Sequence, residues 1–365
     1  MFMRRSTVFL AVMLALSACD RLSGGPRTDG PLLIALDSIR LEESDAVSIG
    51  RPIYLAGEAS GVIYISDAMN NQVLQYAPDG SFVRAYGRPG RGPGEFGFPN
   101  PLALVGDSVL AVGDMGNLQL TFFDRRTGGF LRSARVGQGM FWSMQALGDT
   151  VMVSRVYPGA STSMSIWRPG ADTAVHGGVI PAEYEKVYPL LANHPYTRLA
   201  LLGDTVMIGF SGHADLFLMR PDGTVFDTVS VPAAKRRGVP ADIAARFAAK
   251  PLTDEEIVSM LSILQGMQRL PSGEVAFYYT DGVFANGVMQ GDGFVSVLSK
   301  DLKQACVDAR VTTSPVTAAT IAFRGDTLLS LEQHITDEAR AETYLKRYRI
   351  DTSRCNWIPV ERKGA

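Results

Sequence analysis

The chain has 365 residues, of which 46% are hydrophobic and 20% charged, with a formal net charge of −2. This composition is typical of a globular protein with a large core and excludes a disordered chain. The near-neutral charge gives no reason to expect a polyanionic partner. The 37 glycines and 20 prolines recur between short β-branched and aromatic runs, which favours many short strands over long helices.

Residues 1–18 have the features of an export signal. Arg4 and Arg5 come first, the apolar run Val8–Leu16 follows, and small residues precede Cys19. The run is too short to span a bilayer. Removal of residues 1–18 takes away both arginines and no acidic residue, so the mature chain carries a net charge of −4.

The letters LSAC at Leu16–Cys19 resemble the lipobox of bacterial lipoproteins. The resemblance implies cleavage before Cys19, its acylation, and anchoring of the exported protein to a bacterial membrane, facing the periplasm. Several acyl chains hold firmly because each buried CH₂ adds about 0.8 kcal/mol. Residues 19–30 then form the lipidated cysteine and a polar tether, whose last 11 residues extend over roughly 36 Å at most.

A repeated pattern organises the rest of the chain. Six times a small turn precedes an apolar strand, and a hairpin turn such as Pro78-Asp79-Gly80 or Pro221-Asp222-Gly223 follows. The six copies are GDSVLAVGD at Gly106, GDTVMVSRV at Gly148, GDTVMIGFS at Gly203, GDTLLSLEQ at Gly325, SGVIYISDA at Ser60 and SGEVAFYYT at Ser272. With the preceding strands, each unit has four antiparallel strands. Residues 31–365 are therefore predicted to form an all-β, six-bladed β-propeller.

The first unit closely resembles an NHL repeat. It has a strand followed by Asp67 and Asn70-Asn71, a strand ending in Pro78-Asp79-Gly80, a strand ending at Gly87, and a glycine loop reaching Phe96 and Pro99. The second unit keeps a fainter copy at Asp114, Asn117 and Phe122–Asp124. The resemblance implies that the glycine-rich run Gly87–Gly94 crosses between blades. A phosphate-binding loop would need a helix after it, and Pro99 and Pro101 oppose one.

Loops between the second and third strands share one face of a propeller with the blade crossings, and propellers usually bind ligands there. The candidate residues on this face are Asp67, Asn70, Asp114, Asn117, Arg155, Tyr157, His213, Asp215, Asp281, Glu332 and His334. The alternative is that Asp67, Asn70, Asp114 and Asn117 only cap tight loops.

A metal site is a sharper hypothesis for the same face. Proteins with NHL-type propellers, which the chain resembles, include a peptide-amidating lyase with zinc-binding histidines. Other six-bladed propellers hydrolyse lactones with a calcium ion in the channel. Zinc would draw on His213 and His334, although catalytic zinc sites usually have three protein ligands. Calcium would draw on oxygens of Asp67, Asn70, Asp281 and Asn286. No spacing in the sequence requires either ion, so we expect no cofactor.

The other two cysteines, Cys306 and Cys355, both follow a turn between the third and fourth strands of a unit. An exported protein is free to form disulfides. However, equivalent positions on the outer strands of neighbouring blades should lie farther apart than the ~7 Å that a disulfide spans. The sequence therefore favours two unbonded cysteines.

One segment interrupts the repeats between blades four and five, and helices are predicted over Pro240–Lys250 and Thr253–Met267. Thr253 and Glu256 resemble a capping box, and Ile257, Met260, Leu261 and Leu264 form one apolar stripe. This insert, residues 240–267, should cover the polar face, either as packing on the rim or as a lid. The preceding run Lys235–Arg237 is expected to be a solvated loop.

These features favour a lipid-anchored module of the cell envelope that binds a protein, peptide or small ligand without catalysing a reaction. Two alternatives stay open, a metal-assisted hydrolase or lyase in the channel and a structural scaffold. Export and the acidic mature chain argue against a nucleic-acid partner. Residues Leu32–Leu41 resemble an extra strand, expected to close the ring in the last blade beside Asn356–Val360.

Overall fold

The computed structural model describes residues 31–365 except 138, 158, 169–170, 172, 183, 185–196, 286–287, 312–319, 336–340 and 365. The signal segment, Cys19, the tether and Asn286 lie outside the described residues.

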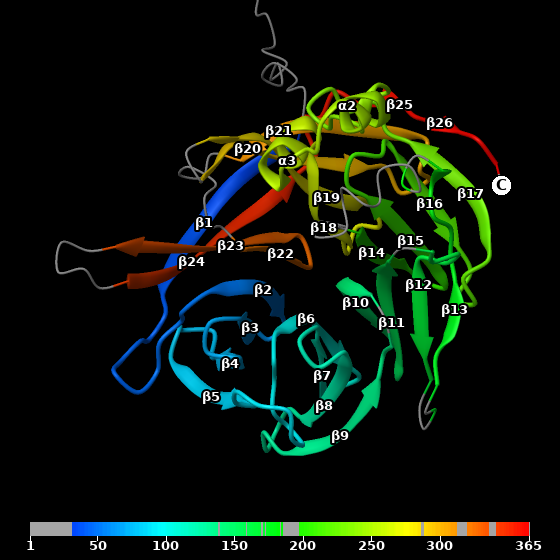
Figure 1. Cartoon of the computed structure of the whole chain (residues 1–365). Helices are drawn as coiled ribbons and strands as arrows, with labels where there is room; N and C mark the ends of the chain where they lie inside the picture. The colour runs from blue at the N-terminus through cyan, green and yellow to red at the C-terminus, as the bar shows by residue number, and fades with distance from the viewer. Residues whose placement is uncertain are drawn as a thin grey trace, which may run out of the picture.

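The described chain forms six antiparallel sheets arranged around a centre, which is a six-bladed β-propeller (Figure 1). The strands of each blade are given from inner to outer. Blade one has β2 (Pro52–Gly57), β3 (Ile63–Asp67), β4 (Gln72–Tyr76) and β5 (Phe82–Tyr86), and blade two has β6 (Pro99–Val105), β7 (Val109–Asp114), β8 (Gln119–Asp124) and β9 (Phe130–Arg135). Blade three has β10 (Met140–Leu147), β11 (Thr150–Val156), β12 (Met164–Trp167) and β13 (Val175–Gly177). Blade four has β14 (Thr197–Leu202), β15 (Thr205–Phe210), β16 (Asp215–Met219) and β17 (Val225–Ser230), and blade five has β18 (Ile263–Arg269), β19 (Val275–Ala285), β20 (Val288–Leu298) and β21 (Gln304–Val311). Blade six has β22 (Thr320–Arg324), β23 (Thr327–Ile335), β24 (Ala341–Asp351) and β1 (Leu32–Arg40).

The hairpins form where the turn residues are. In blade one, Gly80 has a φ of 88°, a conformation that glycine adopts without a steric penalty, and the Ser81 N–H donates to the Asp79 carboxylate at 3.0 Å. Gly223 repeats the φ of 88° in blade four. The predicted turns therefore set the strand order of each blade.

The core lies between blades rather than within them. The described residues form six buried hydrophobic clusters, one between each pair of neighbouring blades, because each sheet buries both of its faces. Tyr64 and Tyr86 of blade one, for example, pack against Phe123 of blade two. The inner strand β22 lies beside β2, so the ring is closed.

The glycine-rich segment crosses from blade one to blade two, as predicted. Phe96 N–H donates to the Arg88 carbonyl and Gly90 N–H to the Phe96 carbonyl, which folds the segment into a compact loop before β6. Gly87 has a φ of 72°, and a Cβ there would lie 2.2 Å from the Phe96 ring. The glycine is needed because the aromatic ring fills that space.

The N-terminal strand closes the ring, but with a different neighbour from the one expected. β1 pairs antiparallel with β24, with Leu33 opposite Ile350, and becomes the outer strand of blade six. The prediction of a closing strand at Leu32–Leu41 is confirmed, whereas its pairing with Asn356–Val360 is wrong. That segment instead leaves blade six. β25 (Ile358–Pro359) pairs with β21, and β26 (Glu361–Arg362) pairs with β17.

The course of this tail also overturns the prediction of unbonded cysteines. Cys306 and Cys355 form a disulfide with a Cα–Cα distance of 5.7 Å. The prediction failed because Cys355 does not lie on an outer strand of blade six. It lies in the tail that turns onto the edge of blade five, where Cys306 lies on β21. The disulfide therefore fixes the tail to blade five.

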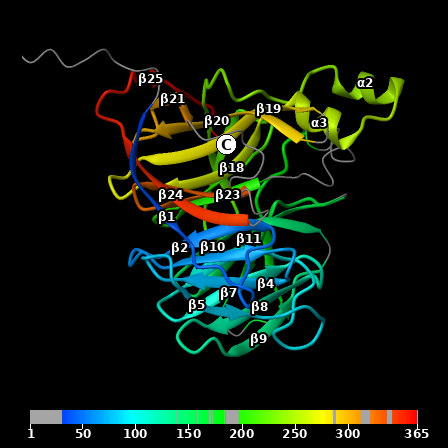
Figure 2. The same cartoon turned by 90° about the vertical axis from the view of Figure 1, so that its left-hand side faces the viewer.

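The insert contains two short helices, α2 (Ile243–Ala249) and α3 (Asp254–Met260), which stand out from one face of the propeller (Figure 2). The capping box at Thr253 and Glu256 is confirmed. The helix predicted over Thr253–Met267 ends at Met260, because Leu261 is extended and Ile263–Arg269 is needed as the inner strand of blade five. Both leucines of the predicted stripe are therefore buried outside the helix, with Leu261 just after it and Leu264 on the inner strand β18 (Ile263–Arg269).

Of the run Lys235–Arg237, Lys235 is exposed as predicted, but the two arginines contact neighbouring blades. Arg236 is 6% exposed, donates to the Ala214 carbonyl at 3.0 Å, and lies 5.5 Å from the centre of the Phe277 ring. Burial lowers the pKa of its guanidinium to about 10. Arg237 is paired with Asp281. These two arginines join the base of the insert to blades four and five.

Candidate functional site

A cavity of about 780 Å³ runs along the centre of the ring. The inner strands of all six blades, β2, β6, β10, β14, β18 and β22, contribute to its wall. No described residue of α2 or α3 lines it, which supports the interpretation of the insert as packing on the rim. The cavity is open enough and large enough for a small ligand.

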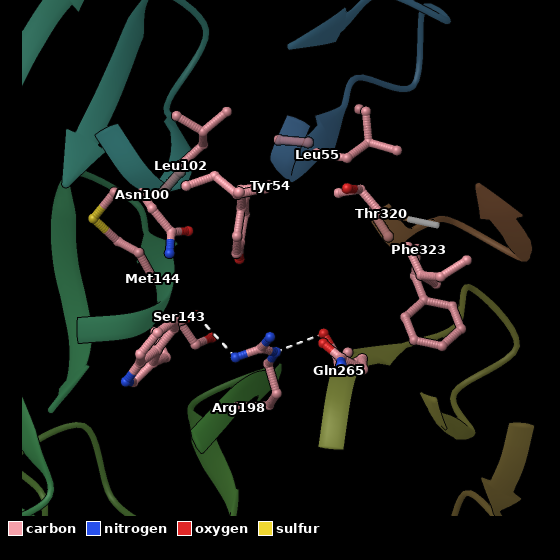
Figure 3. A pocket seen from close by; sticks show the side chains of 18 of the residues that line it. Tyr54, Leu55, Asn100, Leu102, Ser143, Met144, Arg198, Gln265, Thr320 and Phe323 are labelled. Carbon is pink, nitrogen blue, oxygen red and sulfur yellow. Dashed lines mark hydrogen bonds between the residues drawn. The ribbon is translucent and has the colours of Figure 1, made fainter. Parts of the chain in front are cut away.

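The wall combines polar and apolar residues (Figure 3). Its side-chain amides are Asn100, Gln145, Gln265, Gln268 and Gln333. The only charged side chains among the described residues of the wall are Arg51 and Arg198, and no carboxylate, lysine, histidine or cysteine is present among them. The described wall thus offers hydrogen-bonding groups to a ligand.

Arg198, at the start of β14, ties three inner strands together. Its Nε donates to the Gln265 carbonyl of β18 at 2.5 Å, and its Nη1 donates to the Trp142 carbonyl of β10 at 2.9 Å. The side chain crosses this end of the channel (Figure 3). Arg198 therefore holds the walls of blades three, four and five at a fixed distance.

Tyr54 of β2 points into the channel (Figure 3). Burial raises the pKa of its hydroxyl, although Arg198, the Ser143 side chain and the Met144 backbone act in the opposite direction. The phenol is therefore protonated at neutral pH and can donate a hydrogen bond.

Asn100 of β6 lies beside Tyr54 in the same part of the channel (Figure 3). The residue is 4% exposed, and its Oδ1 has no hydrogen-bond partner among the described residues. Most buried side-chain oxygens in proteins have such a partner. Asn100 is therefore the residue of the channel wall with the clearest unused capacity for a ligand.

The face predicted from the sequence has a different role in blade one. The Asp67 carboxylate is fully buried and accepts hydrogen bonds from the N–H groups of Gly50 at 3.0 Å and Arg51 at 2.8 Å. It also accepts from the backbone of Met69 and from the backbone and side chain of Asn70. Asp67 and Asn70 therefore hold the loop that leads into β2.

Blade two repeats the arrangement. Asp114 accepts from the N–H groups of Gly97 at 3.0 Å and Phe98 at 2.8 Å, and from the Asn117 side chain at 2.6 Å. The two aspartates thereby place Arg51 and Phe98 on the channel wall, with the Arg51 guanidinium 5.7 Å from the centre of the Phe98 ring. Their connection with the channel is indirect.

Blades three and four place their predicted residues in local contacts. Arg155 donates to the Val136 carbonyl at 2.7 Å and lies 4.7 Å from the centre of the Tyr157 ring. The Asp215 N–H donates to His213 Nδ1 at 3.1 Å. The Asp215 carboxylate contacts Ser230 and the Lys363 ammonium group, the latter at 2.9 Å.

Blades five and six also place their predicted residues in local contacts. Asp281 is paired with Arg237 and accepts from Ser262 Oγ at 3.0 Å. Glu332 is paired with Lys346 at 2.6 Å, and His334 Nε2 lies 3.6 Å from the same carboxylate. None of the eleven predicted residues lines the channel.

The predicted metal ligands do not converge. Within the part of the chain that the structure describes, no three side chains of His, Cys, Asp or Glu form a group able to hold an ion. The Asp67 oxygens are occupied by N–H donors, which a metal ion would have to displace. The residues present thus do not fit the calcium hypothesis drawn from Asp67 and Asn70.

The channel residues Tyr54, Asn100, Ser143, Arg198 and Gln265 were missed from the sequence. They lie among the first four residues of the inner strand in blades one to five, and not in the loop between the second and third strands. The available signal was a polar residue in an otherwise apolar inner strand, as in NPLALV at Asn100 or TRLALL at Thr197.

Comparisons with known proteins agree with the fold. Residues 32–136 match a family described as a 6-bladed beta-propeller. A stretch of 123 residues, 31% of the chain, is 34% identical to the peptidylglycine alpha-amidating monooxygenase of Rattus norvegicus but spans 12% of that protein. Another of 83 residues, 22% of the chain, is 32% identical to the human NHL repeat-containing protein 3 and spans 24% of it.

A solved structure extends the likeness over most of the chain. A Bacteroides fragilis protein described as exported covers 89% of this chain and 98% of its own, with a TM-score of 0.56 and 12% identity. The chain is a six-bladed β-propeller, and part of it is similar to an NHL repeat-containing protein. The curated relatives are matched over less than a quarter of their length, so this statement concerns the fold and the repeats. Across the described residues, no helix has the length and apolar character needed to cross a membrane.

Proposed function

We propose that the protein is a lipid-anchored binding module of the bacterial cell envelope, and that its ligand binds in the central channel. The observation that carries this proposal is the unused hydrogen-bonding capacity of Asn100 inside a cavity of about 780 Å³. Because every β-propeller surrounds a central channel, the polar groups on its wall favour binding over a scaffold role more than the opening itself does.

Binding without catalysis is favoured by the residue types of the wall. A general acid or base at neutral pH is usually histidine, aspartate or glutamate, and the described wall has none of these. Ser143 is a hydroxyl on the wall, but its Oγ accepts from the Leu199 N–H, and a serine nucleophile needs an adjacent base. A protein or peptide segment, or a small molecule, fits the volume.

Anchoring through Cys19 fits the position of the first described strand. β1 is the outer strand of blade six, at the circumference of the ring (Figure 1). A tether that reaches the propeller at its edge leaves both ends of the channel accessible.

The test begins with the intact protein, purified from its own host in mild detergent. We expect it in the membrane fraction with the mass of an acylated Cys19, and we expect Cys19→Ser to release the chain. Native mass spectrometry should then detect a ligand or partner in stoichiometric amount. A soluble wild-type protein, or one without a bound molecule after mild isolation, contradicts the proposal.

A further inference from the structure

The buried oxygen of Asn100 restricts what the channel can bind. Oδ1 accepts hydrogen bonds and cannot donate them, so only a donor from a ligand or a water molecule can satisfy it. A carboxylate offers acceptors alone at neutral pH. A ligand whose recognised group is such an anion would leave this oxygen unsatisfied, which is unfavourable at a buried site.

Tyr54, as a hydrogen-bond donor, calls for an acceptor on the ligand. Its side chain points into the channel next to Asn100, from the neighbouring blade (Figure 3). Its hydroxyl lies near the Ser143 side chain and the Met144 backbone, and the phenol carries one proton that it can donate. Asn100 Nδ2 is a second donor at the same level. A ligand therefore meets one acceptor and two donors within a small space.

The charges around these two residues favour a neutral group. No carboxylate is present among the described residues of the wall to attract a cationic group. The Arg198 guanidinium lies near Tyr54, but it already donates to the Gln265 and Trp142 carbonyls. A neutral group with one N–H and one carbonyl oxygen satisfies these conditions, and a secondary amide has this composition.

We propose that this level of the channel binds a secondary amide of a neutral ligand, whose N–H donates to Asn100 Oδ1 and whose carbonyl oxygen accepts from Tyr54. The inference rests on the proposed function and specifies the chemistry of the same site. Two sources present this group in the cell envelope, the acetamido substituent of an amino sugar and the backbone of an uncharged peptide.

Saturation-transfer NMR titrations on the acylated full chain in detergent test the inference. The probes are tri-N-acetylchitotriose, N-acetyl-dialanine N-methylamide, and acetate as an anion of similar size to the recognised group. We expect saturation transfer to at least one of the two amides and none to acetate. Binding of the chitotriose alone identifies an amino sugar as the source, and binding of the peptide alone identifies a peptide.

Two variants localise the binding. Tyr54→Phe keeps the ring and removes the donor, so the dissociation constant of the bound amide should rise at least about fivefold. Asn100→Leu should weaken it further. The matched control is Tyr278→Phe, because Tyr278 is a buried tyrosine of blade five, outside the channel wall, whose hydroxyl has no partner among the described residues.

Three results overturn the inference: no binding of either amide, binding of acetate alone, or equal affinity of Tyr54→Phe and wild type for a bound amide. The first result would mean that only water occupies the Asn100 site. If native mass spectrometry nevertheless detects a co-purified ligand, the proposed function stands and only the amide chemistry fails. If neither experiment detects a ligand, both fail.

Discussion

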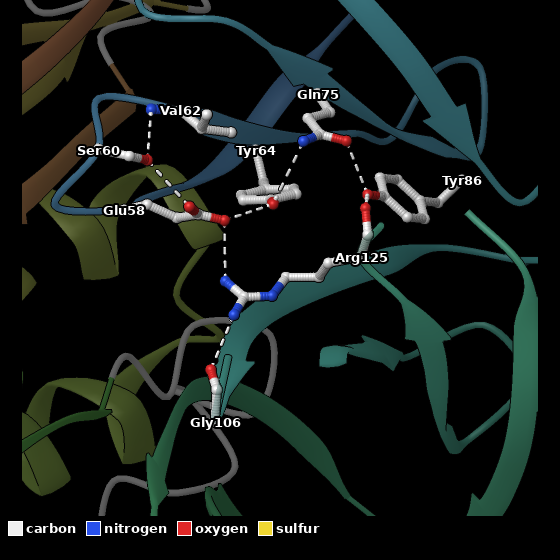
Figure 4. Close-up of polar contacts among 8 residues, drawn as sticks. All are labelled: Glu58, Ser60, Val62, Tyr64, Gln75, Tyr86, Gly106 and Arg125. Atoms are coloured by element: carbon white, nitrogen blue, oxygen red, sulfur yellow. Dashed lines mark hydrogen bonds and ion pairs between the residues drawn. The ribbon is translucent and has the colours of Figure 1, made fainter. Parts of the chain in front are cut away.

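The guanidinium of Arg125 and the carboxylate of Glu58 join blade two to blade one through an ion pair of 2.8 Å (Figure 4). The same Glu58 oxygen accepts from the Tyr64 hydroxyl at 2.7 Å, and Arg125 also donates to the Gly106 carbonyl at 2.8 Å. Gln75 links Tyr64 to Tyr86. Because the Arg125 side chain is 10% exposed, this pair lies within a largely buried network.

Replacement of Arg125 by methionine should destabilise the propeller by about 1–3 kcal/mol, since Glu58 and Gly106 lose their charged donor while partly buried. Urea denaturation measures the change. Arg126→Met is the matched control, because Arg126 is an exposed neighbour and should change stability by at most about 0.5 kcal/mol. The double variant Arg125→Met/Glu58→Gln should lose less than the sum of the single variants, and strict additivity would contradict a coupled pair.

The same network predicts sensitivity to alkaline pH. Burial raises the pKa of Tyr86 to about 12, whereas an unfolded tyrosine titrates near 10. Above pH ~10 the unfolded state loses this proton first, so the free energy of unfolding falls as pH rises towards ~12 and is at its full value below ~10.

Urea midpoints at pH 8 and pH 11 measure this effect for the wild type and Tyr86→Phe. The variant should be less stable at pH 8, where only its hydrogen bonds are lost, but its further decline towards pH 11 should be smaller. An equal decline in both proteins would show that Tyr86 does not contribute to the alkaline transition.

The disulfide should matter for stability. Cys306 and Cys355 are 49 residues apart, and a bridge closing such a loop contributes roughly 2–4 kcal/mol. Cys355→Ser should therefore unfold at a lower urea concentration than the oxidised wild type. Reduction of the wild type should produce the same shift and leave the variant unchanged. A urea midpoint of the wild type that does not change with reductant would contradict the presence of the disulfide.

Closure of the ring gives a further prediction from two leucines. Leu41 is 2% exposed and packs between blades six and one, whereas Leu36 on β1 is 51% exposed. Leu41→Ala should lower the free energy of unfolding by about 2–5 kcal/mol because it leaves a cavity. Leu36→Ala should change it by at most about 0.5 kcal/mol. Thermal or urea unfolding distinguishes the two, and similar losses would contradict this closure.

The propeller could be predicted because its information is local. The Pro-Asp-Gly turns at Pro78 and Pro221 and the apolar strands beside them repeat within each unit, and a repeated hairpin has few ways to bury both faces. The insert was harder. The stripe Ile257–Leu264 fits a helix by spacing, but the demand of blade five for an inner strand overrides that preference after Met260.

The tail and the channel depend on contacts between distant segments. Nothing near Cys355 indicates that the chain turns towards Cys306, because this depends on β1 filling the outer place in blade six. Likewise, Tyr54 and Asn100 each read as a single polar residue in an apolar strand. Their proximity arises only when the six inner strands surround one cavity. The loop residues Asp67 and Asp114 were easier to notice in the sequence, but their hydrogen bonds stabilise the loops.

The most direct test of the central claim is whether a ligand occupies the channel. Native mass spectrometry of the protein isolated from its host should detect a bound molecule in the wild type and in Thr127→Trp, which alters an exposed turn. Thr320→Trp, which places a large ring on the channel wall, should lose it. A folded Thr320→Trp protein that retains the molecule would place the ligand elsewhere and contradict the account.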